Sequence, residues 1–228
     1  MAKDTRLVWD LPTRLFHWLF VLTIVSLYFT AQPGDPTWMP WHMRLGYFAL
    51  GLVSFRIIWG FIGPRHARFV NFLKGPGPIL QYMRGGIKAV GHNPMGGWMV
   101  VLMLVLVGVQ VTTGLFTSDD IAFAGPYNPA VSSAHASLLG TIHHKNFYYF
   151  ILTAVALHLC AITVYTFAFK EKLVPAMFHG HKDAEHVPAT EAISNHELVK
   201  ALIVIAVVAG GIWYLLHAAP PPAEISFD

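Results

Sequence analysis

The chain has 228 residues, of which 55% are hydrophobic and only 12% are charged. A soluble domain of this size usually carries about 25% charged residues, so the composition indicates an integral membrane protein. The formal net charge of +3 is too small and too scattered to predict a nucleic-acid-binding surface. The single cysteine, Cys160, excludes a disulfide framework.

Five apolar segments are long enough to cross about 30 Å of hydrocarbon. They cover residues 15–31, 42–63, 97–117, 146–169 and 198–217. Pro12 precedes the first segment and Asn93 and Pro94 precede the third, and both patterns favour the start of a helix. We therefore predict an all-α membrane bundle with five transmembrane helices, folded as a single domain over residues 1–228.

The Lys and Arg residues alternate between the connections, which predicts the orientation of the chain. They occur in the N-terminal segment and in connections 64–96 and 170–197. They are missing from 32–41, 118–143 and 218–228. We expect a bacterial inner-membrane protein with a cytoplasmic N-terminus, which is retained rather than cleaved, and a periplasmic C-terminus. The polar, His-rich connection 170–197 is expected to be a mobile cytoplasmic loop.

Four histidines form a pattern inside or beside the spans, where ionisable groups are costly and are functional candidates. His144 and His158 are fourteen residues apart. At about 100° and about 1.5 Å per residue they project within about 40° of each other, about 21 Å apart along the helix. The predicted topology then places His17 in an inner layer with His158, and His42 in an outer layer with His144.

Two imidazoles from different helices are the axial ligands that a six-coordinate b-type haem requires. Zinc would need four ligands in one tetrahedral cluster, and these pairs are too far apart for that. Because no CxxCH motif is present, two haems would be bound without thioether links. His143 remains an alternative to His144, although its spacing to His158 leaves an offset of about 60°. Four unrelated histidines near helix ends are the other interpretation.

The remaining histidines lie in connections or at helix ends, where solvated or interfacial side chains are expected. They are His66, His92, His135, His179, His181, His186, His196 and His217. Haem propionates are anionic and usually end near basic groups. Arg14 and Arg56 lie at the depth of the inner layer and are predicted to bind them, although Arg56 could instead extend to the membrane surface. Lys145 and Arg44 lie near the outer layer.

These features resemble the bacterial cytochrome b561 family, in the five-helix branch related to the Ni/Fe-hydrogenase b-type cytochrome subunit. The similarity covers nearly the whole chain and is seen in VWDLPTRLFHW, RIIWGFIGPRHARF, GHNPMGGWMV, GLFTSDDIAFAGP and the HH…ALHLCAITVY segment. The resemblance implies a four-helix core, about residues 11–170, that binds two b haems. The family's ligand pattern carries over to His17, His42, His144 and His158.

The resemblance implies electron transfer across the membrane between the quinone pool and a redox partner. That partner is expected to be a dehydrogenase or hydrogenase subunit, or a c-type cytochrome. An alternative is a stand-alone superoxide:quinone oxidoreductase. A cationic funnel at the outer surface would favour the alternative, and the acidic outer connection 118–143 argues against it. A haem-free scaffold or transporter would leave the two-layer pattern unexplained.

Overall fold

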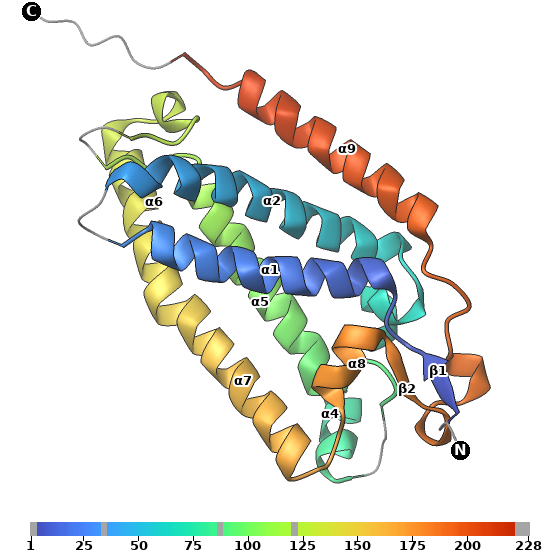
Figure 1. Ribbon diagram of the computed structural model, residues 1–228. Coiled ribbons are helices and arrows are strands. Elements are labelled where there is room, and N and C mark those ends of the chain that lie inside the picture. The colour runs from blue at the N-terminus through green and yellow to red at the C-terminus, as the bar shows by residue number, and fades with distance from the viewer. Residues whose placement is uncertain (1–3, 33–35, 86–88, 120–122, 222–228) are drawn as a thin grey trace, which may run out of the picture.

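The computed structural model describes residues 4–32, 36–85, 89–119 and 123–221 of the chain. Five helical stretches within these residues are long and apolar enough to cross a membrane (Figure 1). They are α1 (Leu11–Thr30), α2 (Met39–Ile62), α5 (Pro94–Gly114), the continuous stretch Ser133–Phe167 and α9 (Leu198–His217). The prediction of an all-α membrane bundle with five spans is confirmed.

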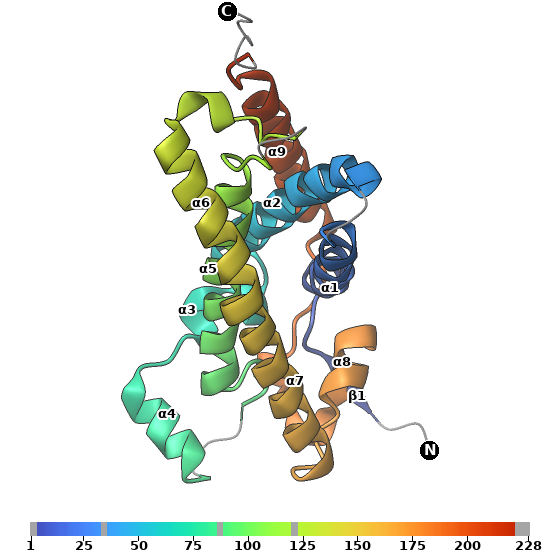
Figure 2. The same cartoon turned by 90° about the vertical axis from the view of Figure 1, so that its left-hand side faces the viewer.

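Helix α2 is the centre of the bundle, because it packs against α1, α5 and α9. Helix α5 in turn packs against the long stretch Ser133–Phe167. Figures 1 and 2 show α9 beside α2, at the outside of the bundle. Buried side chains of α1, α2, α5 and the fourth span form one apolar core, which comprises Leu27, Ala49, Val53, Val107, Val111 and Ile151.

The fourth span differs from its prediction, because it begins at Ser133 and not near residue 146. It consists of α6 (Ser133–Lys145), a π-helical segment η4 (Asn146–Ile151) and α7 (Leu152–Phe167). The side chain of Ser132 caps α6 by accepting from the backbone N–H of His135. Hydropathy did not predict α6 because its sequence is of mixed polarity. At about 1.5 Å per residue these 35 residues exceed the thickness of the hydrocarbon.

Short elements connect the spans. They are η1 (Pro36–Trp38), η2 (Arg65–Ala67), α3 (Phe69–Phe72), α4 (Pro76–Met83) and η3 (Asn128–Ala130). The fourth connection holds α8 (Leu173–His179), β2 (His181–Asp183), η5 (Ala184–His186) and η6 (Ala189–Glu191). The connection for which the sequence predicted a mobile loop therefore contains short helices and a strand.

The fourth connection folds against the N-terminal segment, and residues 4–10 and 170–197 are together called the cap. Strand β1 (Thr5–Leu7) pairs antiparallel with β2. The carbonyl of Gly180 accepts from the backbone N–H groups of Val8 and Trp9 at 2.8 and 3.0 Å. Gly180 has a φ of +87°, a conformation that glycine adopts without strain. The cap thus covers the end of the bundle at which α1 begins (Figure 2).

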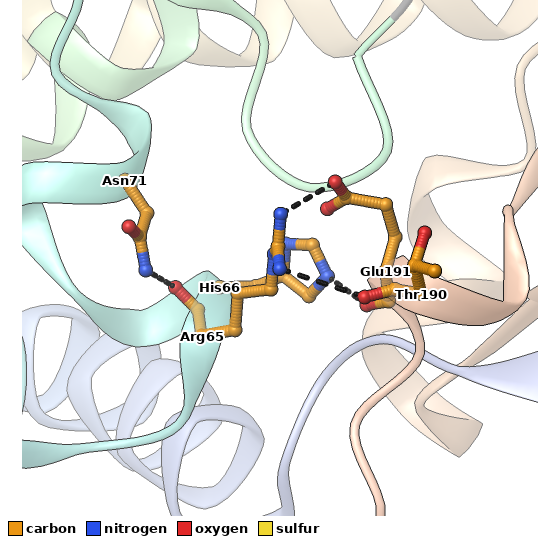
Figure 3. Close-up of polar contacts among 5 residues, drawn as sticks. All are labelled: Arg65, His66, Asn71, Thr190 and Glu191. Atoms are coloured by element: carbon orange, nitrogen blue, oxygen red, sulfur yellow. Dashed lines mark hydrogen bonds and ion pairs between the residues drawn. The ribbon is translucent and has the colours of Figure 1, made fainter.

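A second contact joins the cap to the connection between α2 and α5 (Figure 3). Arg65 Nη2 forms an ion pair with Glu191 Oε1 at 2.6 Å. His66 Nε2–H donates to the Glu191 carbonyl at 2.8 Å, and the Asn71 side chain donates to the Arg65 carbonyl at 2.7 Å. His66 is buried, with 8% of its surface exposed, so its expected solvated position is wrong.

Asp10 fixes the start of α1 to α2. Its side chain is 1% exposed. Oδ1 accepts from the Thr13 backbone N–H at 2.9 Å and from Trp59 Nε1–H at 3.1 Å, and Oδ2 accepts from the Thr13 hydroxyl at 2.7 Å. One carboxylate therefore caps α1 and also satisfies a buried indole on α2.

We predict that Asp10→Ala lowers the free energy of unfolding by about 2–3 kcal/mol, because it removes a helix cap and leaves the buried Trp59 N–H without its acceptor. Asp10→Asn keeps an oxygen that accepts both N–H groups and should lose less than half as much. Thermal unfolding in detergent measures both changes. Equal losses in the two variants would show that the charge matters and not the acceptor.

Candidate functional site

One pair of imidazoles meets at the end of the bundle away from the cap. His42 of α2 and His143 of α6 have ring centres 6.4 Å apart, with the rings inclined at 78°. His42 Nδ1 lies 3.1 Å from the Leu27 carbonyl on α1, and His143 Nδ1 lies 2.9 Å from the Gln110 carbonyl on α5. Because a carbonyl can only accept, each Nδ1 carries the hydrogen and each Nε2 keeps its lone pair for a metal.

A threonine hydroxyl lies beside each of these two imidazoles. Thr30 Oγ1 is 3.3 Å from His42 Nδ1, and Thr113 Oγ1 is 3.3 Å from His143 Nδ1. Each hydroxyl donates to a carbonyl of its own helix, Ser26 for Thr30 and Val109 for Thr113. Both imidazoles are therefore held in the same way by a neighbouring helix. The sequence did not predict these contacts, because backbone carbonyls carry no signal in a residue pattern.

The sequence placed His144 opposite His42, and the structure places His143 there. His144 is exposed and its ring lies 4.8 Å from that of Tyr148, between ring centres. The expected phase assumed an uninterrupted α-helix between His144 and His158. The π-helical segment η4 interrupts it and changes the phase of every residue before it.

The second pair of histidines lies nearer the cap. His17 of α1 and His158 of α7 are both partly buried, and the two imidazoles interact electrostatically. Within the part of the chain that the structure describes, His17 Nδ1 is buried without a hydrogen-bond partner. Helix α8 of the cap lies beside this pair, because Trp18 Nε1–H donates to the Met177 carbonyl at 3.2 Å and Trp18 stacks on Phe178.

Two predicted arginines lie at this depth. Arg56 is 2% exposed, so the interpretation that it extends to the membrane surface is wrong. Its guanidinium lies over the rings of Phe69 and Phe72, and Nη1 and Nη2 have no hydrogen-bond partner among the described residues. Arg14 donates from Nη1 to the Phe178 carbonyl, while its Nε is buried without a partner in the same described set. Buried donors that lack acceptors are costly and fit an anionic group such as a propionate.

His92 is buried beside the inner site, although its position in a connection predicted a solvated side chain. Its ring packs against Trp9 of the cap and Phe72 of α3, with ring centres 4.7 and 4.6 Å away. Burial lowers the pKa of His92 to about 3, and the nearby Arg56 guanidinium adds to the effect. Burial also lowers the pKa of His66, although the Glu191 carbonyl partly opposes this. Both imidazoles are therefore neutral at pH 7.

The geometry of the outer pair, His42 and His143, fits two ligands of one haem iron. Among the described residues, no group of three or more His, Cys, Asp or Glu side chains could hold a metal ion. With metal–nitrogen bonds of about 2.0 Å and ring nitrogens about 1.1 Å from the ring centre, two axial imidazoles have centres about 6 Å apart. The outer pair, at 6.4 Å, matches this spacing.

A protein family described as prokaryotic cytochrome b561 matches residues 8–180. The chain belongs to this family. The matched region holds both histidine pairs, Arg14 and Arg56, and it ends before α9. The family binds b-type haem, so the cytochrome carries this cofactor. Its five long apolar helices make it a multi-pass membrane protein.

The cytochrome is also similar to curated proteins named probable Ni/Fe-hydrogenase B-type cytochrome subunit. The protein of Rhodobacter capsulatus is 23% identical over 77% of this chain and 80% of its own length. The protein of Cupriavidus necator is 24% identical over 77% and 86%, and that of Azotobacter chroococcum 24% over 76% and 86%. None of the solved structures matches the chain.

We predict that His92 makes the cytochrome less stable in acid. Its pKa is lowered to about 3 in the folded protein and is about 6.5 in the unfolded chain, so between these values the unfolded chain binds more protons. Stability is therefore lost as the pH falls below about 6.5, by at most about 2 kcal/mol at pH ~5. His92→Phe keeps a ring against Trp9 and Phe72 and removes the proton site.

The measurement is thermal unfolding in detergent at neutral and acidic pH. The wild type should lose more stability on acidification than His92→Phe does. If both proteins lose the same amount, His92 is not held neutral by the fold.

Proposed function

We propose that the chain is a dihaem b-type cytochrome that passes electrons across the bacterial inner membrane, between the quinone pool and a redox partner protein. The observation that carries the proposal is that two pairs of histidines, on four spans, lie at two depths. His143 and His158 belong to the same helical rod and are about 21 Å apart along it. A single hop across about 30 Å of hydrocarbon is thereby divided into shorter ones.

His42 and His143 would hold the outer haem, and His17 and His158 the inner one. Each haem supplies a one-electron iron couple when it is bound. The chain's own residues set the ligand orientation. Because the Leu27 and Gln110 carbonyls accept from Nδ1–H, they direct Nε2 of each outer imidazole away from its supporting helix and make that nitrogen a more basic ligand.

Arg14 and Arg56 would bind the propionates of the inner haem. Arg56 of α2 lies over Phe69 of α3, and its two buried terminal nitrogens can donate side by side to one carboxylate. Asp10, which begins α1, lies near the same guanidinium. The inner site is therefore closed on one side by the cap, which positions both Asp10 and α8.

A hydrogenase is the proposed partner, because the similar proteins are named as hydrogenase cytochrome subunits. A dehydrogenase subunit or a c-type cytochrome would use the same haem pair. The proposed orientation has a cytoplasmic N-terminus, which places the cap and the inner pair on the cytoplasmic side. This follows from the Lys and Arg residues in connections 64–96 and 170–197.

We predict that wild-type cytochrome purified in detergent contains two non-covalent haems with low-spin b-type spectra. His158→Ala and His17→Ala should each reduce the content to about one haem, and so should His42→Ala, because each change removes one of two axial ligands. Pyridine haemochrome assays and reduced-minus-oxidised spectra measure this. His186→Ala, at an exposed position, is the matched control. Retention of two low-spin haems in His158→Ala would contradict the inner site.

We also predict that quinol reduces the haems of the cytochrome in lipid vesicles, and that His158→Ala slows this reduction at least about tenfold because the chain of hops is interrupted. Addition of a purified hydrogenase with hydrogen should reduce the haems in the wild type. Reduction by superoxide with quinone as the final acceptor, in the absence of any partner, would support the stand-alone oxidoreductase instead. A failure of quinol and of every partner to exchange electrons would contradict the proposed function.

A further inference from the structure

Two neighbouring histidines compete for one position on the fourth span. In an unbroken α-helix ending at His158, His144 would lie about 40° from the face of His158 and His143 about 60° from it. The structure shows the reverse preference, since His143 faces His42 and His144 is exposed. A feature between these residues and His158 must therefore change the helical phase.

That feature is the π-helical segment η4. The Leu152 backbone N–H donates to the Phe147 carbonyl, five residues back instead of four. A π turn accommodates one residue more than an α turn. The fifteen residues from His143 to His158 therefore advance as fourteen would in an α-helix. His143 takes the direction that the α-helical calculation gave to His144, and His144 is turned by about 100° to the outside.

The segment is held by a polar contact with α5. Asn146, which is 5% exposed, donates from Nδ2 to the Leu106 carbonyl and to Gln110 Oε1, both at 2.9 Å. The backbone carbonyl of the same Gln110 accepts from His143 Nδ1–H. One residue of α5 thus contacts both the first residue of the π segment and the imidazole that the segment turns inward.

Phe147 and Ile151 of the segment pack in the apolar core, but the other apolar side chains of the segment do not. The aromatic side chains of the segment at Tyr148, Tyr149 and Phe150 are 41%, 66% and 58% exposed, so they face outward and contribute little to the core. The buried side chains of the segment are Asn146 and Ile151. Because a buried amide is costly when unpaired, the two bonds from Asn146 favour the wide turn over a regular α-helix, which would rotate this amide away.

We propose that the π segment, fixed by Asn146 on Gln110, selects His143 over His144 as the outer haem ligand. This inference rests on the proposed dihaem function and deepens it. Asn146 and Gln110 are positioning residues, since they act through His143 and the backbone. His144 would be a free imidazole at the surface.

The first test compares the two histidines in the full-length protein. His143→Ala should lose the outer haem, and His144→Ala should keep both haems with unchanged low-spin spectra. Asn146→Leu removes both bonds to α5, and its outer haem affinity should fall about tenfold or more, as for other losses of support behind a ligand. The outer haem that remains in Asn146→Leu should depend on His144, so adding His144→Ala should remove it. Thr163→Val, which removes an intrahelical bond on α7, is the matched control.

The second test changes the length of the segment and leaves Asn146 and Gln110 in place. Deletion of Tyr149 restores α-helical spacing with His143 in its present direction, so two haems should remain and His143→Ala should still remove the outer one. Insertion of one alanine after Phe150 adds about 100° and should abolish the outer haem. Circular dichroism and gel filtration establish that each variant is folded.

The outcomes separate this inference from the proposed function. Wild-type protein without haem would overturn the proposed function itself. Two haems in the wild type, with the outer one lost in His144→Ala and kept in His143→Ala, would leave the function standing and overturn the selection of His143. Loss of the outer haem from folded protein on deletion of Tyr149 would show that the π segment does not set the phase.

Discussion

The bilayer allows a polar group inside a helical bundle to persist only when another group satisfies it. This constraint explains the arrangement of the outer pair, in which Nδ1 of His42 and of His143 faces a backbone carbonyl and a threonine hydroxyl of a neighbouring helix. The carbonyl oxygens can accept these bonds because each has two lone pairs, so it can accept a side-chain hydrogen bond in addition to the one within its helix. The remaining nitrogen of each imidazole is left for a metal. Ligand orientation and helix packing are thus parts of the same interaction.

The inner pair, His17 and His158, is subject to the same requirement that buried polar groups have partners. Around His17 and Arg56, several buried donors have no acceptor among the described residues. Such a set would be unstable in an apoprotein and is consistent with a b-type cytochrome, in which an anionic cofactor supplies acceptors. The cap covers the end of the bundle at which α1 begins. Asp10 belongs to the cap and to the first helix at once.

The family match ends before α9, yet α9 packs closely on the haem-carrying bundle. Phe55 and Trp59 of α2 meet Ala201 and Val204 of α9 in a second apolar cluster. Trp59 also donates to Asp10, so the packing of α9 reaches the start of α1 through one indole.

The sequence by itself determined the class of the protein, its five spans and the idea of two histidine layers, because hydropathy and helical spacing are local properties. It also placed His17, His42 and His158 on different spans at two depths. It could not predict that the fourth span begins at Ser133, since a helix that extends beyond the membrane need not be apolar. The buried positions of His66 and His92 depended on how the cap folds over them.

The position of His143, and not His144, opposite His42 is seen only in the tertiary structure. One residue in an α-helix changes direction by about 100°, so a single π turn exchanges the roles of two neighbours. The first residue of that turn, Asn146, donates to Gln110 of another helix, 36 residues earlier in the chain. The periodicity of one helix cannot predict such a contact. The buried amide of Asn146 forms its hydrogen bonds only after the helices have packed.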